Sequence, residues 1–411
     1  MDNKSVLYLS YDGMTDNLGQ SQVIPYLAGL SKLGFSISIL SFEKETNYND
    51  NKEKIAVLLS QNSIGWIPLP YTAKPPVLST MVDIRKMYVV AKKHCLDNAI
   101  KIVHCRSYIS ALVGLQLKKK LGIKFIFDMR GFWADERVEG RIWNLKNPLY
   151  KLVYIYFKNQ EIKFLNNSDY CISLTEAGKN YIISRKDIRA DINITVIPCC
   201  ADLNHFNYQA ISQETRNAKR KQFGYSTETV IYSYLGSIGT WYLLDEMLDL
   251  FGEIYETNNK ARFIFFSADN PDGIFEKAKT KGLSKDLITI YKAQRAELPA
   301  LLSICNASVF FIKPSFSKTA SSPTKMGELM GMGIPLICNA NVGDVSRIME
   351  DTHVGILVSN FDKDNLHTIA MKCSELELLS KEEIRKAALK WYSLEEGVSN
   401  YNNVYTSVLK S

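Results

Sequence analysis

Residues 313–337 read KPSFSKTASSPTKMGELMGMGIPLI, and this stretch decides the expected fold of the chain. The apolar run 307–312 before it predicts a buried strand, and residues 334–338 predict the next short strand. Between the two strands a Ser/Thr-rich loop leads to Pro323, which is expected to open a helix that Gly333 helps to end. Strands and helices that alternate in this way are typical of a parallel α/β sheet.

The loop before this helix combines the groups that bind phosphate. Its hydroxyls, the free backbone N–H groups of a helix start and the positive end of the helix dipole meet at one point. Lys325 adds a positive charge, and Glu328 adds a carboxylate able to accept hydrogen bonds from a ribose diol. We therefore expect Ser322, Pro323 and Thr324 to form a donor-binding site with these two residues. An ordinary loop with a solvated lysine is the alternative.

The segment 322–328, followed by Gly333, Pro335 and Ile337, resembles a variant of the donor-binding motif of retaining glycosyltransferases of family 4. The resemblance implies the GT-B fold, an α/β architecture of two Rossmann-like doubly wound domains that face each other across a cleft. In the more common form of the motif a glutamate contacts the transferred sugar. That glutamate would fall on Ala320 here, so the carboxylate is missing.

Length and composition favour a soluble two-domain enzyme. The chain has 411 residues, 46% of them hydrophobic and 23% charged, and it has no apolar run long enough to span a bilayer. The eight cysteines form no CxxC pair, which favours a reducing compartment without structural zinc. Because a first strand is expected after a short polar lead, we expect no signal peptide and a cytoplasmic location.

The positive charge is confined to one half of the chain. Residues 1–205 hold 27 Lys and Arg against 19 Asp and Glu, a net charge of +8, whereas residues 206–411 hold 23 against 24. The excess includes Arg85, Lys92 and residues 118–120. A solvated helix face explains it, and so does peripheral attraction to an anionic membrane surface or to a phosphorylated acceptor. Nucleic acid is not an expected partner, because no recognised binding module is present.

Two alternating units predict two domains, residues 1–205 with a helix at about 394–411 crossing back, and residues 206–393. Expected N-terminal strands are 6–10, 36–41, 65–68, 102–105, 125–128, 170–174 and 195–197, and expected helices are 21–33, 80–98, 110–121 and 148–166. Expected C-terminal strands are 230–235, 262–266, 288–291, 307–312, 335–338 and 355–358. The resemblance assigns acceptor binding to the N-terminal domain and donor binding to the C-terminal one.

The loop after the strand 230–235 is a second candidate phosphate site. Gly236 and Gly239 allow the backbone to approach a ligand closely, although a plain strand–helix turn explains them as well. Family members usually carry an Arg and a Lys at the positions of Ser237 and Tyr242, so the diphosphate is expected to rely on Lys325 and backbone N–H groups. Lys292, just after another strand, is expected near the nucleotide base.

The N-terminal half offers further loops at strand ends. The resemblance places the loop of Gly13 and Gly19 near the acceptor, and its lack of a GxGxxG spacing argues against an NAD- or FAD-dependent oxidoreductase. Arg106 is expected to face the same cleft. Arg130 is predicted to clamp the donor diphosphate or the acceptor, and a structural pair with Asp128 is the alternative.

The expected activity is hexosyl transfer from a nucleotide-diphosphate sugar to a hydroxyl of a saccharide or lipid-linked saccharide, with retention, in surface polysaccharide or glycolipid assembly. Lys325, Glu328, Arg130 and Asp128 are the candidate catalytic residues. No cofactor is expected, and no metal, because no Asp-x-Asp motif or His/carboxylate cluster follows a strand in a position to bridge the diphosphate to a divalent ion. Two alternatives remain, a nucleotide-sugar epimerase of the same fold and a non-catalytic sugar-nucleotide binding protein.

Overall fold

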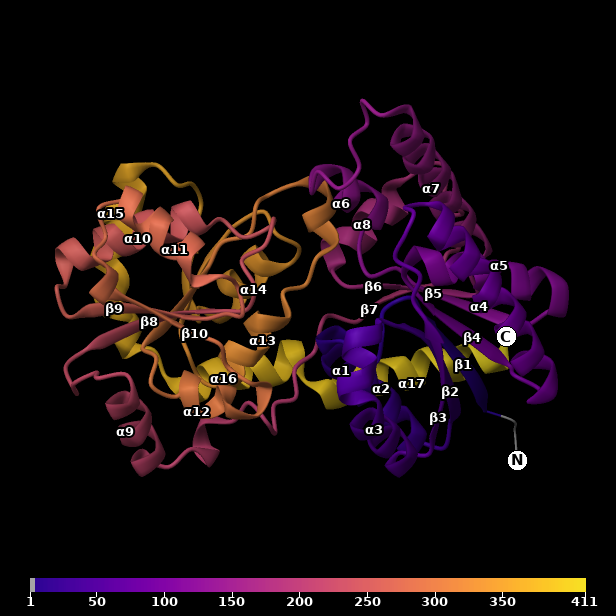
Figure 1. Cartoon of the computed structure of the whole chain (residues 1–411), viewed down its shortest axis with the longest axis horizontal. Helices are drawn as coiled ribbons and strands as arrows, with labels where there is room; N and C mark the ends of the chain where they lie inside the picture. The colour runs from indigo at the N-terminus through magenta and orange to yellow at the C-terminus, as the bar shows by residue number, and fades with distance from the viewer. Residues whose placement is uncertain (1–3) are drawn as a thin grey trace. The chain divides into compact units, whose positions relative to one another are not determined.

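The chain folds around two parallel β-sheets, each in its own compact unit, in a computed structural model that describes residues 4–411 (Figure 1). The first unit consists of the residues up to Pro198, 319–321 and Leu394–Ser411, and the second of Cys199–Lys318 and Ser322–Ser393. The expected α/β class with two doubly wound sheets is confirmed. The division falls at Pro198 rather than after residue 205. Within the second unit, the N–H of Ala201 donates to the Tyr392 carbonyl.

The first sheet has seven parallel strands among the described residues, in the order β3-β2-β1-β4-β5-β6-β7. The strands are β1 (Ser5–Ser10), β2 (Ser36–Glu43), β3 (Ile64–Pro70), β4 (Ile102–Arg106), β5 (Lys124–Asp128), β6 (Tyr170–Ser173) and β7 (Ile194–Val196). The helices are α1 (Asn17–Gln22), α2 (Ile24–Lys32), α3 (Glu45–Gln61), α4 (Leu78–Asp97), α5 (Ser107–Leu121), α6 (Trp133–Glu139), α7 (Pro148–Asn167), α8 (Glu176–Ser184) and α17 (Leu394–Lys410). The strand order reverses between β1 and β4.

The second sheet has six parallel strands among the described residues, in the order β10-β9-β8-β11-β12-β13. The strands are β8 (Val230–Leu235), β9 (Ala261–Phe266), β10 (Ile288–Tyr291), β11 (Ala307–Phe310), β12 (Leu336–Asn339) and β13 (Gly355–Val358). The helices are α9 (Gln213–Gln222), α10 (Leu244–Thr257), α11 (Pro271–Thr280), α12 (Leu298–Leu302), α13 (Thr324–Gly331), α14 (Val345–Thr352), α15 (Lys363–Lys372) and α16 (Lys381–Tyr392). Here the order reverses between β8 and β11.

Several strands are apolar on both faces, and this pattern explains why the sheets are parallel and covered by helices. β1, β4, β11 and β12 are buried at every residue, as expected for strands covered by helices on both sides. Each unit has its own large cluster of buried apolar side chains. The last helix, α17, packs against α2 and β4 of the first unit (Figure 1). Two aromatic residues of this helix, Tyr401 and Tyr405, are buried.

Three expectations about local structure were wrong. The helix expected at 21–33 is two helices, α1 and α2, which meet at Val23. Pro25 lies in the first turn of α2 and has no N–H to continue a helix from α1. The helix α3 was not expected, because it buries only Ile55 and Leu59 and has almost no apolar stripe. The strand expected to reach residue 312 ends at Phe310.

Candidate active site

The two predicted phosphate loops of the second unit lie at the point where its sheet reverses strand order. Gly236 directly follows β8, and the loop that leads to α13 follows β11, the neighbouring strand. In open parallel sheets ligands bind beyond the carboxyl ends of the strands at such a switch point. Topology alone therefore brings the Gly236 turn and the start of α13 together.

The Lys325 ammonium lies at the centre of this site, in the first turn of α13. Its Nζ is 3.7 Å from the ring centre of Tyr242 and 4.1 Å from that of Tyr234. A Cβ added to Gly236 would lie 3.4 Å from Nζ, so the ammonium lies beside the space that this glycine leaves open. Among residues 4–411 no hydrogen-bond acceptor reaches Nζ, although the residue is only 8% exposed.

Such an ammonium is poorly stabilised by the protein alone. Burial lowers the pKa of Lys325 well below its usual value, and the carboxylates of Glu328 and Asp269 only partly favour the charged form. The two tyrosine rings stabilise a cation through their faces but accept no strong hydrogen bond from it. A buried charge without a hydrogen-bonding partner is costly, so an anion bound beside Gly236 would remove that cost.

Asp269, which the sequence analysis did not single out, holds the Gly236 turn in place. Its carboxylate accepts hydrogen bonds from the Ile238 N–H at 2.5 Å, the Ser237 hydroxyl at 2.8 Å and the Ser267 hydroxyl at 2.9 Å. Burial opposes ionisation, but these bonds hold the pKa of Asp269 below its usual value. The Ser237 hydroxyl therefore faces Asp269, and its hydrogen bond helps to hold the turn in place. Gly236 has φ +106°, which glycine adopts at no steric cost.

The other predicted donor-binding residues surround the start of α13 or lie at strand ends. Pro323 occupies the N-cap position and Thr324 the first turn, where backbone N–H groups have no partner within a helix. The Ser322 hydroxyl accepts a hydrogen bond from the Cys199 N–H at 3.1 Å. Gly239 has φ +48° in the turn after β8, and Lys292 is exposed just beyond β10.

Glu328 lies one turn after Lys325 and has a partner that the sequence analysis missed. Arg295 Nη1 donates to Glu328 Oε1 at 2.8 Å, and the guanidinium stacks over the Phe206 ring at 5.2 Å. Burial raises the pKa of Glu328, and Arg295 only partly offsets this effect. Arg295 begins a short 3₁₀ helix, Arg295–Glu297. The carboxylate is thus held in one orientation by a neighbour that is itself 44% exposed.

Ala320, where the missing glutamate would fall, is a buried residue of the first unit. Its Cβ lies 2.9 Å from the position of a Cβ added to Gly178, and the Thr175 hydroxyl donates to the Thr319 carbonyl at 2.8 Å. The side chain therefore packs in the apolar core of that unit. A carboxylate at this position would be buried among apolar side chains at a high cost in free energy, so an alanine suits the local packing.

In the first unit, Asp128 is the centre of a buried polar cluster at the end of β5. Its Oδ2 accepts from the Tyr401 hydroxyl at 3.0 Å and contacts His104 Nε2 at 3.3 Å and Arg130 Nη1 at 3.8 Å. His104 Nδ1 shares a hydrogen bond of 2.7 Å with the Tyr405 hydroxyl. Burial opposes ionisation, but Arg130 and His104 hold the pKa of Asp128 below its usual value. Asp128 is fully buried, which supports the structural pair with Arg130.

Arg106 ends β4, the strand next to β5, and lies in the same cluster. Its Nε donates to Asp12 Oδ2 at 3.2 Å, while Nη1 is buried without a hydrogen-bond partner among residues 4–411. Arg130 has φ +55°, an uncommon conformation for a residue with a side chain. Two guanidinium groups thus lie near the carboxyl ends of β4 and β5.

Gly13 and Gly19 shape the loop after β1 through close backbone contacts. A Cβ at Gly19 would lie 2.3 Å from the Gly13 carbonyl, and one at Gly13 would lie 2.7 Å from Glu43 Oε2. The buried Glu43 carboxylate accepts from the Met14 N–H at 2.8 Å and from the Thr15 hydroxyl at 2.5 Å. These glycines therefore allow Glu43 to fix the loop, whether or not a substrate is bound.

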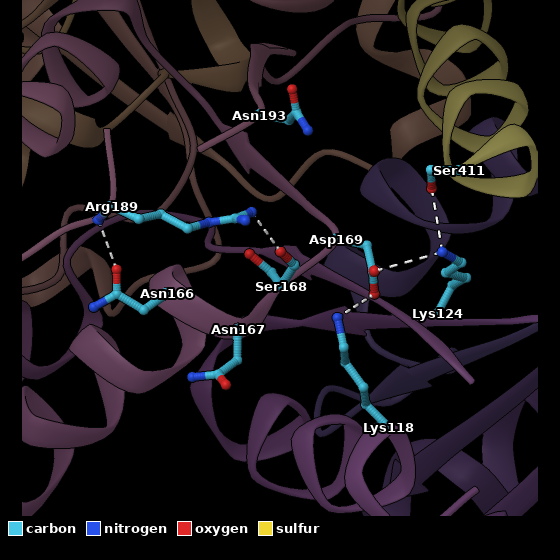
Figure 2. A pocket seen from close by; sticks show the side chains of 9 residues that line it. All are labelled: Lys118, Lys124, Asn166, Asn167, Ser168, Asp169, Arg189, Asn193 and Ser411. Carbon is cyan, nitrogen blue, oxygen red and sulfur yellow. Dashed lines mark hydrogen bonds and ion pairs between the residues drawn. The ribbon is translucent and has the colours of Figure 1, made fainter. Parts of the chain in front are cut away.

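A cavity of about 360 Å³ lies at the opposite edge of the first sheet (Figure 2). It is lined by Lys118, Lys124, Asn166, Asn167, Ser168, Asp169, Arg189, Asn193 and Ser411. Lys118 pairs with Asp169 at 2.8 Å, and Arg189 Nη2 donates to the Ser168 carbonyl at 2.8 Å. Because Lys124, Asp169 and Asn193 begin or precede strands, this cavity is remote from the carboxyl edge that carries Arg106 and Asp128.

The described part of the chain has neither a cluster of metal ligands nor a helix able to cross a bilayer. No group of three or more His, Cys, Asp or Glu side chains between residues 4 and 411 could hold a metal ion. No helix in that range is both long and apolar enough to cross a bilayer. All eight cysteines are free and buried.

Two family models match the chain. The model described as Glycosyltransferase Family 4 matches residues 20–205, and the model described as Glycosyl transferases group 1 matches residues 215–391. Among curated proteins none matches the chain.

Solved structures are similar in fold over the whole length. Sucrose-phosphate synthase from Thermosynechococcus elongatus superposes with a TM-score of 0.72 at 14% identity, covering 99% of each chain. A glycosyltransferase from Rickettsia africae gives 0.71 at 15% identity, covering 100% of each chain. The Anabaena protein HepE, in complex with UDP and glucose, gives 0.71 at 14% identity, covering 98% of this chain and 99% of its own.

Proposed function

Because the chain belongs to the GT-B glycosyltransferases of the family 4 type, which use nucleotide sugars, we propose that it transfers a hexose-type sugar with retention to an acceptor hydroxyl. The acceptor is a saccharide or a lipid-linked saccharide of surface polysaccharide or glycolipid assembly. The UDP and glucose held by the Anabaena neighbour support a nucleotide-diphosphate sugar as donor.

The observation that carries the proposal is the buried Lys325 ammonium, which has no hydrogen-bond acceptor among residues 4–411 and lies beside the space left open at Gly236. The donor diphosphate supplies the missing anion there. Backbone N–H groups at the start of α13 donate to the same phosphates, and the helix dipole favours their charge. Glu328, oriented by Arg295, accepts from the ribose hydroxyls.

Lys325 then acts on the reaction itself. The bond between the anomeric carbon and the diphosphate oxygen breaks, and its electron pair moves to that oxygen, beside the ammonium. The acceptor oxygen bonds to the same carbon on the same face, and its proton passes to the leaving phosphate. This route needs no carboxylate at Ala320, which is buried. A fixed positive charge where negative charge develops is an effective form of catalysis.

Arg106 and Arg130 are the groups we assign to the acceptor side. The Nη1 of Arg106 supports this assignment, because it is buried without a hydrogen-bond partner among residues 4–411 and can donate to a bound acceptor. Asp128 positions Arg130 and does not reach a substrate itself. The proposed location is cytoplasmic, with peripheral association at the inner face of the membrane.

A ligand screen followed by a transfer assay tests this function. UDP, GDP and ADP, each alone and as a sugar conjugate, are compared by thermal shift, because a ligand that binds the folded state raises the melting temperature. The best donor, labelled in its sugar, is then incubated with and without a polyprenyl diphosphate saccharide. Transfer that needs the acceptor and keeps the anomeric configuration supports the proposal. Reaction without acceptor indicates an epimerase, and binding without turnover a non-catalytic protein.

Metal independence is part of the proposal, since the one Asp-x-Asp triplet of the sequence, Asp362-Lys363-Asp364, begins α15, where the Asp362 side chain caps the helix. Turnover should be unchanged in EDTA. A loss that Mg²⁺ or Mn²⁺ restores would contradict the assignment of the diphosphate to Lys325 alone.

A further inference from the structure

The segment 141–156, which we name the apolar-basic face, connects α6 to α7 and continues into the first half of α7. It loops outward from the first unit, and α7 follows at the periphery of that unit (Figure 1). Six large apolar side chains in this face are between 36% and 66% exposed. They are Ile142, Leu145, Leu149, Leu152, Ile155 and Tyr156.

These exposed side chains lie on one side of α7 while another side packs inward. Phe157, Phe164 and Leu165 are buried in the core of the unit. Leu149, Leu152 and Tyr156 are three and four residues apart, which places them in one stripe on the outer side of the helix. A contiguous exposed apolar surface of this kind marks an interaction site in soluble proteins.

The charges within the segment 141–156 all have one sign. Between Gly140 and Gln160 the chain has no Asp or Glu, whereas it has Arg141, Lys146, Lys151 and Lys158. The first three are exposed, and Lys158 pairs with Asp135 and Glu161. Exposed apolar residues of the second unit can have acidic neighbours instead. Leu378, for example, lies close in sequence to Glu375 and Glu377.

The position of the face in the fold connects it to the candidate acceptor groups. α7 lies on the crossover between β5 and β6, which run parallel, so α7 starts at the carboxyl edge of the sheet. Arg106 and Asp128 end their strands at this same edge. A surface that bound the apolar-basic face would therefore lie on the side of the unit where the acceptor groups are.

We propose that the apolar-basic face docks on an anionic lipid bilayer. The stripe enters the boundary between headgroups and acyl chains, and Arg141, Lys146 and Lys151 contact lipid phosphates, as in interfacial amphipathic helices. Docking would bring a lipid-linked acceptor to Arg106 and Arg130, and this purpose rests on the proposed function. The binding itself does not depend on it.

Vesicle flotation of the full chain tests the proposal. Wild type is compared on vesicles of phosphatidylglycerol mixed with phosphatidylcholine and on vesicles of phosphatidylcholine alone. Reversing Lys146 and Lys151 to Glu should weaken binding to the anionic vesicles by about 25-fold or more, at about fivefold per cation. Leu149→Gln with Leu152→Gln should weaken it about tenfold, because the stripe no longer gains from leaving water. Added salt should weaken wild-type binding.

A matched control removes two exposed apolar residues elsewhere, through Met371→Gln with Leu378→Gln, and should leave vesicle binding unchanged. Wild type that fails to float with anionic vesicles overturns the proposal, as does an equal loss in the control. Concentration-dependent dimers that the leucine variant abolishes would instead assign the face to a second copy of the chain.

Nucleotide binding separates the two proposals. All of these variants should bind the donor nucleotide as wild type does, because none lies in the second unit's phosphate site. Vesicle binding without any sugar transfer would leave the docking surface standing and remove the proposed function. Transfer to a soluble acceptor without vesicle binding would do the reverse.

Discussion

Two of the buried charged sites of the molecule differ in how their charges are satisfied. Asp128 in the first unit has Tyr401, His104 and Arg130 around its Oδ2. Lys325 in the second unit has aromatic rings around its Nζ and no hydrogen-bond acceptor among residues 4–411. In the first arrangement the protein itself satisfies Oδ2, although Asp128 Oδ1 has no hydrogen-bond partner among residues 4–411. The Lys325 ammonium has no acceptor in that range and needs an anion from outside. Both sites therefore shift the pKa of a buried group. They differ because Asp128 has hydrogen-bond donors and an opposite charge within the protein, whereas the Lys325 ammonium has no hydrogen-bond acceptor among residues 4–411.

The largest effect should come from removing the carboxylate of the first site. Asp128→Ala removes the carboxylate that Arg130 and His104 face, and loss of one partner of a buried ion pair costs about 3–5 kcal/mol of unfolding free energy. Urea denaturation measures it. Asp191→Ala, which removes an exposed carboxylate, is the control and should change little. A stable Asp128→Ala protein would mean that Asp128 is kept for chemistry and not for structure.

The second effect concerns turnover. Lys325→Ala should lower the rate at saturating donor about a hundred- to thousandfold, equivalent to about 2.7–4 kcal/mol of charge stabilisation in the transition state. Lys325→Arg should recover only part of this, because a planar guanidinium does not replace a compact ammonium. Steady-state kinetics provide the measurement, with the exposed Lys279→Ala as control. Wild-type turnover in Lys325→Ala would make this residue a packed lysine without catalytic function.

The third effect is on donor affinity. Glu328→Ala should weaken nucleotide-sugar binding by about 1–3 kcal/mol, the range for a lost hydrogen bond to a charged group, and should leave the protein folded. The variant also leaves Arg295 without its carboxylate, so Arg295→Ala is the companion variant. Calorimetry with the donor measures both. An unchanged dissociation constant for Glu328→Ala would remove Glu328 from the ribose site.

A smaller effect, of opposite sign to that of Asp128→Ala, should appear in the stability of the free protein. Lys325→Met should raise its unfolding free energy by about 1–3 kcal/mol, because it removes a buried ammonium that lacks a hydrogen-bond acceptor. The folded state has the lowered pKa, so the unfolded chain binds the extra proton between that pKa and about 10.4. Wild-type stability should therefore gain a rising contribution with pH across this window, and the Met variant should lack it. Denaturation at several pH values, without nucleotide, detects both. A destabilised Met variant would contradict the contrast between the two sites.

Much of the fold follows from the sequence because parallel strands are continuous apolar runs. The strands 230–235, 288–291 and 355–358 were predicted at their observed bounds. Helices with weak apolar stripes were harder. α3 was missed, and the break at Val23 depends on Pro25 within an otherwise continuous pattern.

The candidate site was predictable only in part. Lys325, Glu328 and Gly236 were found through the motif and the strand ends. Asp269 and Arg295 were not assigned to the site, because their roles depend on which strands are neighbours and not on spacing along the chain. Asp269 follows β9, next to β8 in the sheet, so strand order is the signal that would have identified it. The contacts of Tyr401 and Tyr405 with Asp128 and His104 link residues far apart in the sequence.

The central claim, that Lys325 holds the donor diphosphate, is tested most directly by calorimetry on two ligands and two proteins. The nucleoside diphosphate that binds best in the ligand screen and its parent nucleoside are each titrated into wild type and Lys325→Ala. We predict that the variant loses affinity for the diphosphate about tenfold or more while binding the nucleoside as wild type does. Equal losses for both ligands, or no loss for either, would contradict the assignment.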